Sequence, residues 1–101
     1  MVDGGGHLVS FKRMDDSQIA SIDIAIHKAR AAAKFRRETK VFETAMTVLN
    51  LHYIGTLDDV IASRGGIPLV EGGKLIGAIG CSGGTGSQDE VVAKAGAALV
   101  K

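Results

Sequence analysis

The sequence predicts an α+β domain, in which antiparallel strand pairs and amphipathic helices enclose one core. Two observations lead to this prediction. Short apolar runs occur in pairs joined by glycine turns, once near the N-terminus and once around Gly72-Gly73. Longer segments between and after these pairs carry apolar residues every three or four positions, as on one face of a helix. The expected order is strand, strand, helix, helix, strand, strand, helix.

The composition indicates a single globular domain over residues 1–101, with a modest core. Hydrophobic residues make up 46% of the chain but aromatic residues only 4%, which predicts an aliphatic, alanine-rich core. The net charge of +1 argues against a nucleic-acid-binding protein. A single cysteine, Cys81, excludes an internal disulfide framework and favours a reducing, cytoplasmic location. No signal peptide or membrane-spanning run is recognisable, so no membrane partner is expected.

The N-terminal hairpin is predicted from Met1–Asp3 and Leu8–Met14, which flank three glycines. Asp15, Asp16 and Ser17 can cap the next helix, which is expected over Ile19–Phe35. The predicted buried stripe of this helix consists of Ile19, Ile22, Ile26, Ala29 and Ala33.

A second helix is expected to be capped by Thr39 and to end near Asn50. Its predicted apolar side consists of Phe42, Ala45, Met46 and Leu49. Residues 51–64 carry no clear pattern, and a helical turn over Leu57–Ala62 is the only element that they indicate.

The segment from Gly65 to Ala95 predicts strand, turn, strand, glycine-rich loop and helix. The strands are Ile67–Val70 and Lys74–Cys81, and Gly72-Gly73 between them can adopt the positive φ of a tight hairpin turn. Ser87 and Glu90 have the spacing of a capping box, which predicts a helix from about Gln88 to Leu99. The side chains expected to be buried on this helix are Val91, Val92, Ala95 and Leu99.

The loop Ser82–Ser87 is the clearest candidate binding site, because backbone amides at a helix start attract anions. The predicted contributors are Ser82, Gly83, Gly84, Thr85 and Ser87. The alternative is a connection whose glycines only allow the turn, with at least one of Gly83 and Gly84 at positive φ. Asp89 and Glu90 oppose anion binding because they place negative charge at the same helix start.

Four stretches and one residue together resemble the GlcG/HbpS-like family of haem-binding or haem-degrading domains. They are Val2–Val9, the helix and its end over Ile19–Thr39, Gly65–Leu69, Ile76–Thr85 and Asp89, in the family's order. The resemblance implies a profilin-like fold, with a central antiparallel sheet and helices packed on both sides. It also implies an N-terminally short domain, since members usually carry a helix and a complete first strand before the segment that matches Val2–Gly5.

In the light of this resemblance, His7 is a candidate axial ligand of haem or a metal, although a histidine after a glycine turn is also a common exposed hairpin residue. His27 and His52 are weaker candidates, and the three show no His-x-x-x-His spacing. Arg13, Arg36 and Arg37 can pair with a carboxylate, or form a solvated helix end. Met14 and Cys81 are softer candidate ligands that can equally serve packing. Catalytic residues and a metal site are not indicated.

The resemblance implies a small-ligand-binding domain, for haem or another anionic cofactor, in an oligomeric accessory protein. One alternative is a non-catalytic structural or interaction protein of glycolate, diol or glycerol utilisation. A second alternative is a haem-degrading enzyme. A homo-oligomer is expected because the helix that usually precedes this sequence covers one face of the sheet, and because exposed apolar patches mark interfaces.

Overall fold

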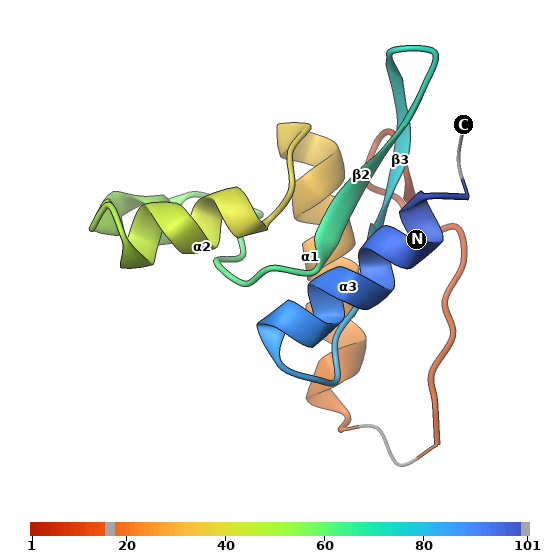
Figure 1. Ribbon diagram of the computed structural model, residues 1–101, viewed down its shortest axis with the longest axis horizontal. Coiled ribbons are helices and arrows are strands. Elements are labelled where there is room, and N and C mark those ends of the chain that lie inside the picture. Colours follow the sequence, from red (N-terminus) through yellow and green to blue (C-terminus); the bar gives the residue numbers. More distant parts are fainter. Residues whose placement is uncertain (16–17, 100–101) are drawn as a thin grey trace.

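The computed structural model describes residues 1–15 and 18–99, and it has the predicted α+β architecture (Figure 1). In chain order the elements are β1 (Val2–Asp3), α1 (Ala20–Phe35), α2 (Lys40–Thr47), the 3-10 helix η1 (His52–Thr56), β2 (Gly66–Glu71), β3 (Lys74–Gly80) and α3 (Gly86–Ala97). Helices α1 and α3 pack on opposite faces of the sheet, which confirms the profilin-like prediction. The predicted caps Asp16 and Ser17 lie outside the described residues.

The sheet is antiparallel, with the strand order β1-β3-β2, so that β3 is central. Val2 of β1 pairs with Ala78, and Ile67 of β2 pairs with Ile79. The predicted hairpin is confirmed, since Gly72 and Gly73 join β2 to β3 with φ of 58° and 77°.

The predicted strand over residues 8–14 is wrong. Only an isolated bridge joins Leu8 to Val2, and the following residues run as an extended segment along the edge of the molecule (Figure 1). The register places Val2 opposite Leu8, so β1 lies beside only the first residues of this segment. Val9 and Ser10 still donate backbone hydrogen bonds to the Met1 carbonyl, at 2.9 and 3.3 Å.

The core is small and alanine-rich, as the composition predicts. Its central cluster consists of Val2, Ala29, Ala32, Ala33 and Ala78. Helix α1 lies directly on β3, and the two backbones are so close that a Cβ atom at Gly80 would collide with the Ala25 carbonyl and the Ala29 amide. Side chains of one carbon, and a glycine, are therefore what allow these two backbones to approach.

The predicted buried stripe of α1 is correct only toward the C-terminal end of the helix. Ala29 and Ala33 are buried, but Ile22 and Ile26 are half-buried and Ile19 is 77% exposed. The sheet is too narrow to cover the N-terminal turns of the helix, which border a cavity instead. Lys28 is buried beside the stripe, which the sequence did not predict.

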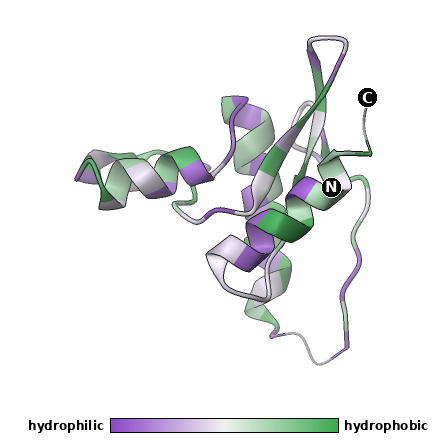
Figure 2. Ribbon diagram, in the orientation of Figure 1, coloured by the Kyte–Doolittle hydropathy of each residue, from purple (hydrophilic) through white to green (hydrophobic). Residues whose placement is uncertain are grey.

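The predicted buried face of α3 is wrong. Val91, Val92 and Leu99 are 68, 58 and 82% exposed, and Ala95 is also exposed. The buried residues are Asp89 and Ala93. The helix thus buries a small and a polar residue and leaves its larger apolar side chains at the surface, and its ribbon carries both hydrophobic and hydrophilic colours (Figure 2).

Helix α2 and η1 form an arm that extends away from the sheet (Figure 1), with residues 40–56 as its bounds. Phe42 anchors it through an edge-on contact with Phe35, with ring centroids 5.2 Å apart. Asn50 follows α2 at a φ of 54°, which agrees with the predicted helix end. Leu49, predicted to be on the apolar side, is 59% exposed, whereas Phe42 and Ala45 are buried.

Two further local predictions for the arm are wrong. Thr39 precedes α2 but does not cap it with its side chain; its hydroxyl accepts a hydrogen bond from the Gly66 amide at 2.9 Å. The helical turn expected over residues 57–62 occurs earlier, as η1.

The close contact of α1 with β3 leads to a stability prediction. Gly80→Ala should lower the free energy of unfolding by about 2 kcal/mol or more, because the new methyl group must push two backbones apart. Gly4→Ala is the matched control, since a Cβ there meets only the Leu75 carbonyl at 3.8 Å. Urea unfolding measures both, and equal stability of the two variants would contradict the packing.

Candidate functional site

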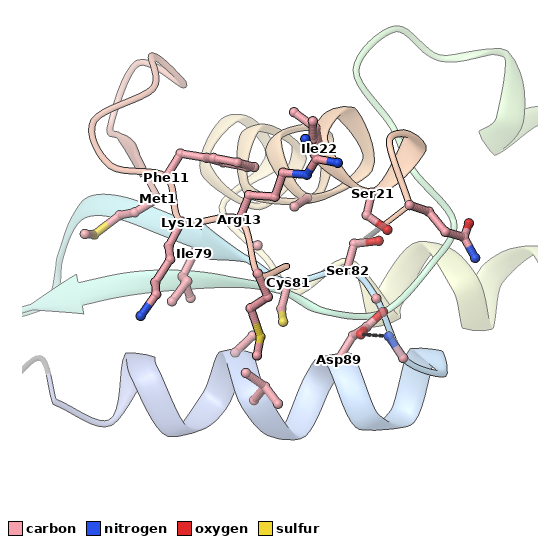
Figure 3. A pocket seen from close by; sticks show the side chains of 18 of the residues that line it. Met1, Phe11, Lys12, Arg13, Ser21, Ile22, Ile79, Cys81, Ser82 and Asp89 are labelled. Carbon is pink, nitrogen blue, oxygen red and sulfur yellow. Dashed lines mark hydrogen bonds between the residues drawn. The ribbon is translucent and has the colours of Figure 1, made fainter. Parts of the chain in front are cut away.

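A cavity of about 780 Å³ lies between the N-terminal half of α1, the end of β3, the start of α3 and the segment of residues 10–15 (Figure 3). Its size is that of a typical small-molecule site. Phe11, Ile22, Ile79 and Val92 provide apolar walls. The cavity is therefore suited to a ligand with a substantial apolar part.

Two cationic residues, Lys12 and Arg13, also line the cavity from the extended segment. In Figure 3 the Arg13 side chain runs toward α1 near Ile22, while Lys12 points the other way from the same segment. A guanidinium beside an apolar wall can bind a carboxylate in a bidentate manner. The segment that failed to form a strand thus contributes the positive charge of the site.

Four of the predicted site residues meet in this cavity: Arg13, Ser82, Gly83 and Gly84. The softer candidate ligands Met14 and Cys81 line it as well. Thr85 and Ser87 do not line it; Thr85 is the N-cap of α3 and Ser87 lies in its first turn.

The start of α3 differs from the predicted capping box. The box consists of Thr85 and Gln88, with the Gln88 amide donating to Thr85 Oγ1 at 3.2 Å and the Thr85 amide donating to Gln88 Oε1 at 2.9 Å. The sequence holds two overlapping matches to the pattern, Thr85–Gln88 and Ser87–Glu90, and local pattern alone does not choose between them.

The residues between β3 and the cap, 81–84, form the connecting loop. Gly83 has a φ of 144°, which confirms the expected positive φ in the glycine pair. The Gly84 amide donates to Asp89 Oδ1 at 2.9 Å (Figure 3). The amides of Gly84 and Thr85 are thus already bound to side-chain oxygens, and the anion attraction of this loop depends on its remaining groups and on the cations nearby.

The acidic residues at the start of α3 are compensated by lysines. Asp89 Oδ2 is 2.9 Å from Lys28 Nζ, with side-chain exposures of 7% and 2%. Glu90 lies 3.3 Å from Lys94 and 3.9 Å from Lys40. The repulsion expected from the sequence is therefore largely cancelled, by Lys28 and Lys40 from far away along the chain and by Lys94 from the next turn of α3.

Cys81 is half-buried where β3 meets the connecting loop. Burial raises the pKa of its thiol, and the Asp89 carboxylate raises it further, while Lys28 acts in the opposite direction. The group is accordingly a thiol at neutral pH, which is a weaker nucleophile and metal ligand than a thiolate.

His7 lies away from the cavity, on the turn after β1. Its side chain is 83% exposed, and Nδ1 is 3.4 Å from Asp3 Oδ1. The pKa of Asp3 is lowered, first by the hydrogen bond from the His7 amide. His27 and His52, which the structure also describes, do not line the cavity either.

Arg36 lines a second cavity, of about 730 Å³, with Lys34 and Lys74. Lys34 is paired with Asp59 at 2.7 Å. Arg37 donates from Nε to the Phe35 carbonyl at 2.9 Å. The predicted arginine set is thus divided, and only Arg13 belongs to the first cavity.

Within residues 1–15 and 18–99, no group of three or more His, Cys, Asp or Glu side chains is arranged to hold a metal ion. Among the helices of this part of the chain, none is long and apolar enough to cross a bilayer.

The observed cap gives a test of how α3 begins. Thr85→Ala should lower the free energy of unfolding by about 1 kcal/mol, because it removes the hydroxyl that accepts from the Gln88 amide. Ser87→Ala should change stability by less than about 0.5 kcal/mol, because Ser87 lies inside the helix. Chemical denaturation of both variants measures the difference. A larger loss of stability in Ser87→Ala than in Thr85→Ala would instead support the capping box of Ser87 and Glu90.

Comparison with known proteins matches residues 1–98 to a family described as "Haem degrading protein HbpS-like". The chain is 34% identical over 97 residues to an uncharacterized 15.0 kDa protein in the dhaT-dhaS intergenic region of Citrobacter freundii, covering 93% of this chain and 68% of that protein. It is 43% identical over 82 residues to Protein GlcG of Escherichia coli K12, covering 81% and 60%. The chain thus spans roughly two thirds of its relatives' length.

The fold is also similar to that in the crystal structure of a PduOC:heme complex. The TM-score is 0.86 and the sequences are 28% identical, with 99% of this chain and 75% of that chain covered. The similarity includes both the sheet and the helices that surround the cavity, because it extends over almost all of the chain.

Proposed function

Because this chain belongs to the HbpS-like family, we propose that it is a small-ligand-binding domain whose first cavity takes haem or another anionic cofactor. The observation that carries the proposal is the combination of apolar walls with Lys12 and Arg13 in one cavity of about 780 Å³. The similar structure of a PduOC:heme complex supports haem as the first ligand to test.

The residues of the cavity fit the two parts of a haem molecule. The flat macrocycle is apolar and requires walls such as Phe11, Ile22 and Val92. Its two carboxylates require cations, which Lys12 and Arg13 supply. Bound haem would supply redox or oxygen chemistry, whereas the protein would supply orientation and charge compensation.

Met14 lines the cavity and would be the candidate side chain to hold the haem iron there. Cys81 is disfavoured because burial raises its pKa and keeps it protonated. His7 remains a sequence-based proposal for a haem bound at the turn after β1, outside the cavity. The two positions are far enough apart in the fold to be separated by mutation.

Arg13→Ala should weaken binding of ferric haem by about tenfold, the loss of one charge-assisted hydrogen bond. Arg37→Ala is the matched control, because it also removes one positive charge but lies outside the cavity. An absorption titration at constant ionic strength measures both variants. If both variants bind haem equally weakly, the loss comes from the change in net charge, and the proposal that haem binds in this cavity is contradicted.

His7→Ala should leave the Soret band of the haem complex unchanged, because the exposed ring lies outside the cavity. Met14→Ala should shift the band. The opposite pattern in the same absorption spectra would move the haem from the cavity to the turn after β1.

The two alternative functions make different predictions for the same titration. An interaction protein of glycolate, diol or glycerol utilisation would show no haem spectrum, and the exposed apolar side chains of the arm favour this alternative. A haem-degrading enzyme would lose the Soret band when a reductant is added. Stable binding without turnover supports the proposed function.

We also propose that the protein is a homo-oligomer. Val48, Leu49 and Tyr53 of the arm are 71, 59 and 60% exposed, and α3 exposes further large apolar side chains. Light scattering at micromolar concentration should therefore give a mass above that of the 10.5 kDa chain. A stable monomer would contradict the proposal, and Tyr53→Glu should reduce the mass if the arm forms the interface.

A further inference from the structure

One ion pair holds both ends of the connecting loop. Lys28 Nζ donates to the Cys81 carbonyl at 3.0 Å and to Asp89 Oδ2 at 2.9 Å. The other carboxylate oxygen of Asp89 accepts from the Gly84 amide at 2.9 Å. Residues 61 positions apart, one from α1 and one from α3, thus fix the first and the last residue of the loop.

The surrounding backbone is shaped to admit this pair. Gly65 has a φ of 124°, and the atoms around its Cα leave no room for a side chain. A Cβ atom there would lie 3.1 Å from Lys28 Nζ, 3.0 Å from Asp89 Cβ and 2.9 Å from the Cys81 carbonyl oxygen. The Cys81 amide in turn donates to the Gly65 carbonyl at 3.0 Å.

Stability alone is a weak reason for a pair buried to this extent. Removing two charges from water carries a large desolvation cost, and well-packed apolar replacements of buried ion pairs are often as stable or more stable. What an apolar pair could not do here is hydrogen-bond the Cys81 carbonyl and the Gly84 amide. Asp89 also lines the first cavity, so the pair lies directly behind the loop that faces it.

We propose that Lys28 and Asp89 are positioning residues that hold residues 81–84 in the form that receives the anionic part of a ligand in the first cavity. This inference rests on the proposed function. Asp89 orients the Gly84 amide, and Lys28 both orients the Cys81 carbonyl and neutralises the carboxylate. Without Lys28, the same carboxylate would repel the anion from the cavity.

The test replaces both charges together, as Lys28→Met/Asp89→Leu, so that no unpaired charge is buried. The double variant should melt within about 5 °C of the wild type, since only its loop loses hydrogen bonds. Amide hydrogen exchange at residues 82–84 should become at least about tenfold faster, and ferric haem should bind at least about tenfold more weakly. The matched control is Glu90→Gln/Lys94→Gln, which removes the outer ion pair of α3 and should change neither readout.

Unchanged loop exchange and unchanged haem affinity in the folded double variant would overturn the proposal. If the double variant does not fold, Lys28→Met/Asp89→Asn decides, because it buries no unpaired charge, keeps an acceptor for the Gly84 amide and loses only the hydrogen bond from Lys28 to the Cys81 carbonyl. Its haem affinity should fall at least about tenfold, and wild-type affinity would overturn the proposal. If the wild type binds no haem, the proposed function fails, and loop exchange in the double variant alone supports or overturns the positioning role.

Discussion

The close approach of α1 to β3 is the constraint on which the rest of the structure depends. It is possible because Ala25, Ala29 and Gly80 bring backbone against backbone with no large side chain between them. Because the helix is this close to the central strand, a long side chain on the helix can extend past the end of that strand. Lys28 does so, and its ammonium group lies 2.9 Å from the carboxylate of Asp89 on α3.

The same close packing leaves the domain with little apolar volume to bury. The core cluster contains four alanines and Val2, while larger side chains such as Val91 and Leu99 remain at the surface. Burial of an alanine removes less apolar area from water than burial of leucine or isoleucine, so the stabilisation gained per residue is smaller. The exposed apolar side chains of the arm and of α3 therefore add hydrophobic stabilisation only when a further protein surface or a ligand covers them.

The sequence predicted those features of the fold that are determined locally. The Gly72-Gly73 hairpin and the length of α1 follow from turn chemistry and from helical periodicity. The failures concern choices that need tertiary information: whether residues 8–14 find a strand partner, which of two overlapping patterns caps α3, and which face of α3 meets the sheet. In α3 the apolar pattern pointed away from the sheet, because packing against the sheet selected Ala93 and Asp89 instead.

The candidate site shows the same division. Arg13 and the glycine loop were recognisable because their residue types match the chemistry of anion binding, but their partners were not. Lys28 reads as one of several helix lysines, and Asp89 as a charge that opposes an anion, until the fold places them 2.9 Å apart. The pairing changes the electrostatic argument: a loop with a free carboxylate behind it repels an anion, whereas a loop behind a neutral ion pair does not. Whether this loop can receive an anion is thus decided on α1, far from the loop in sequence.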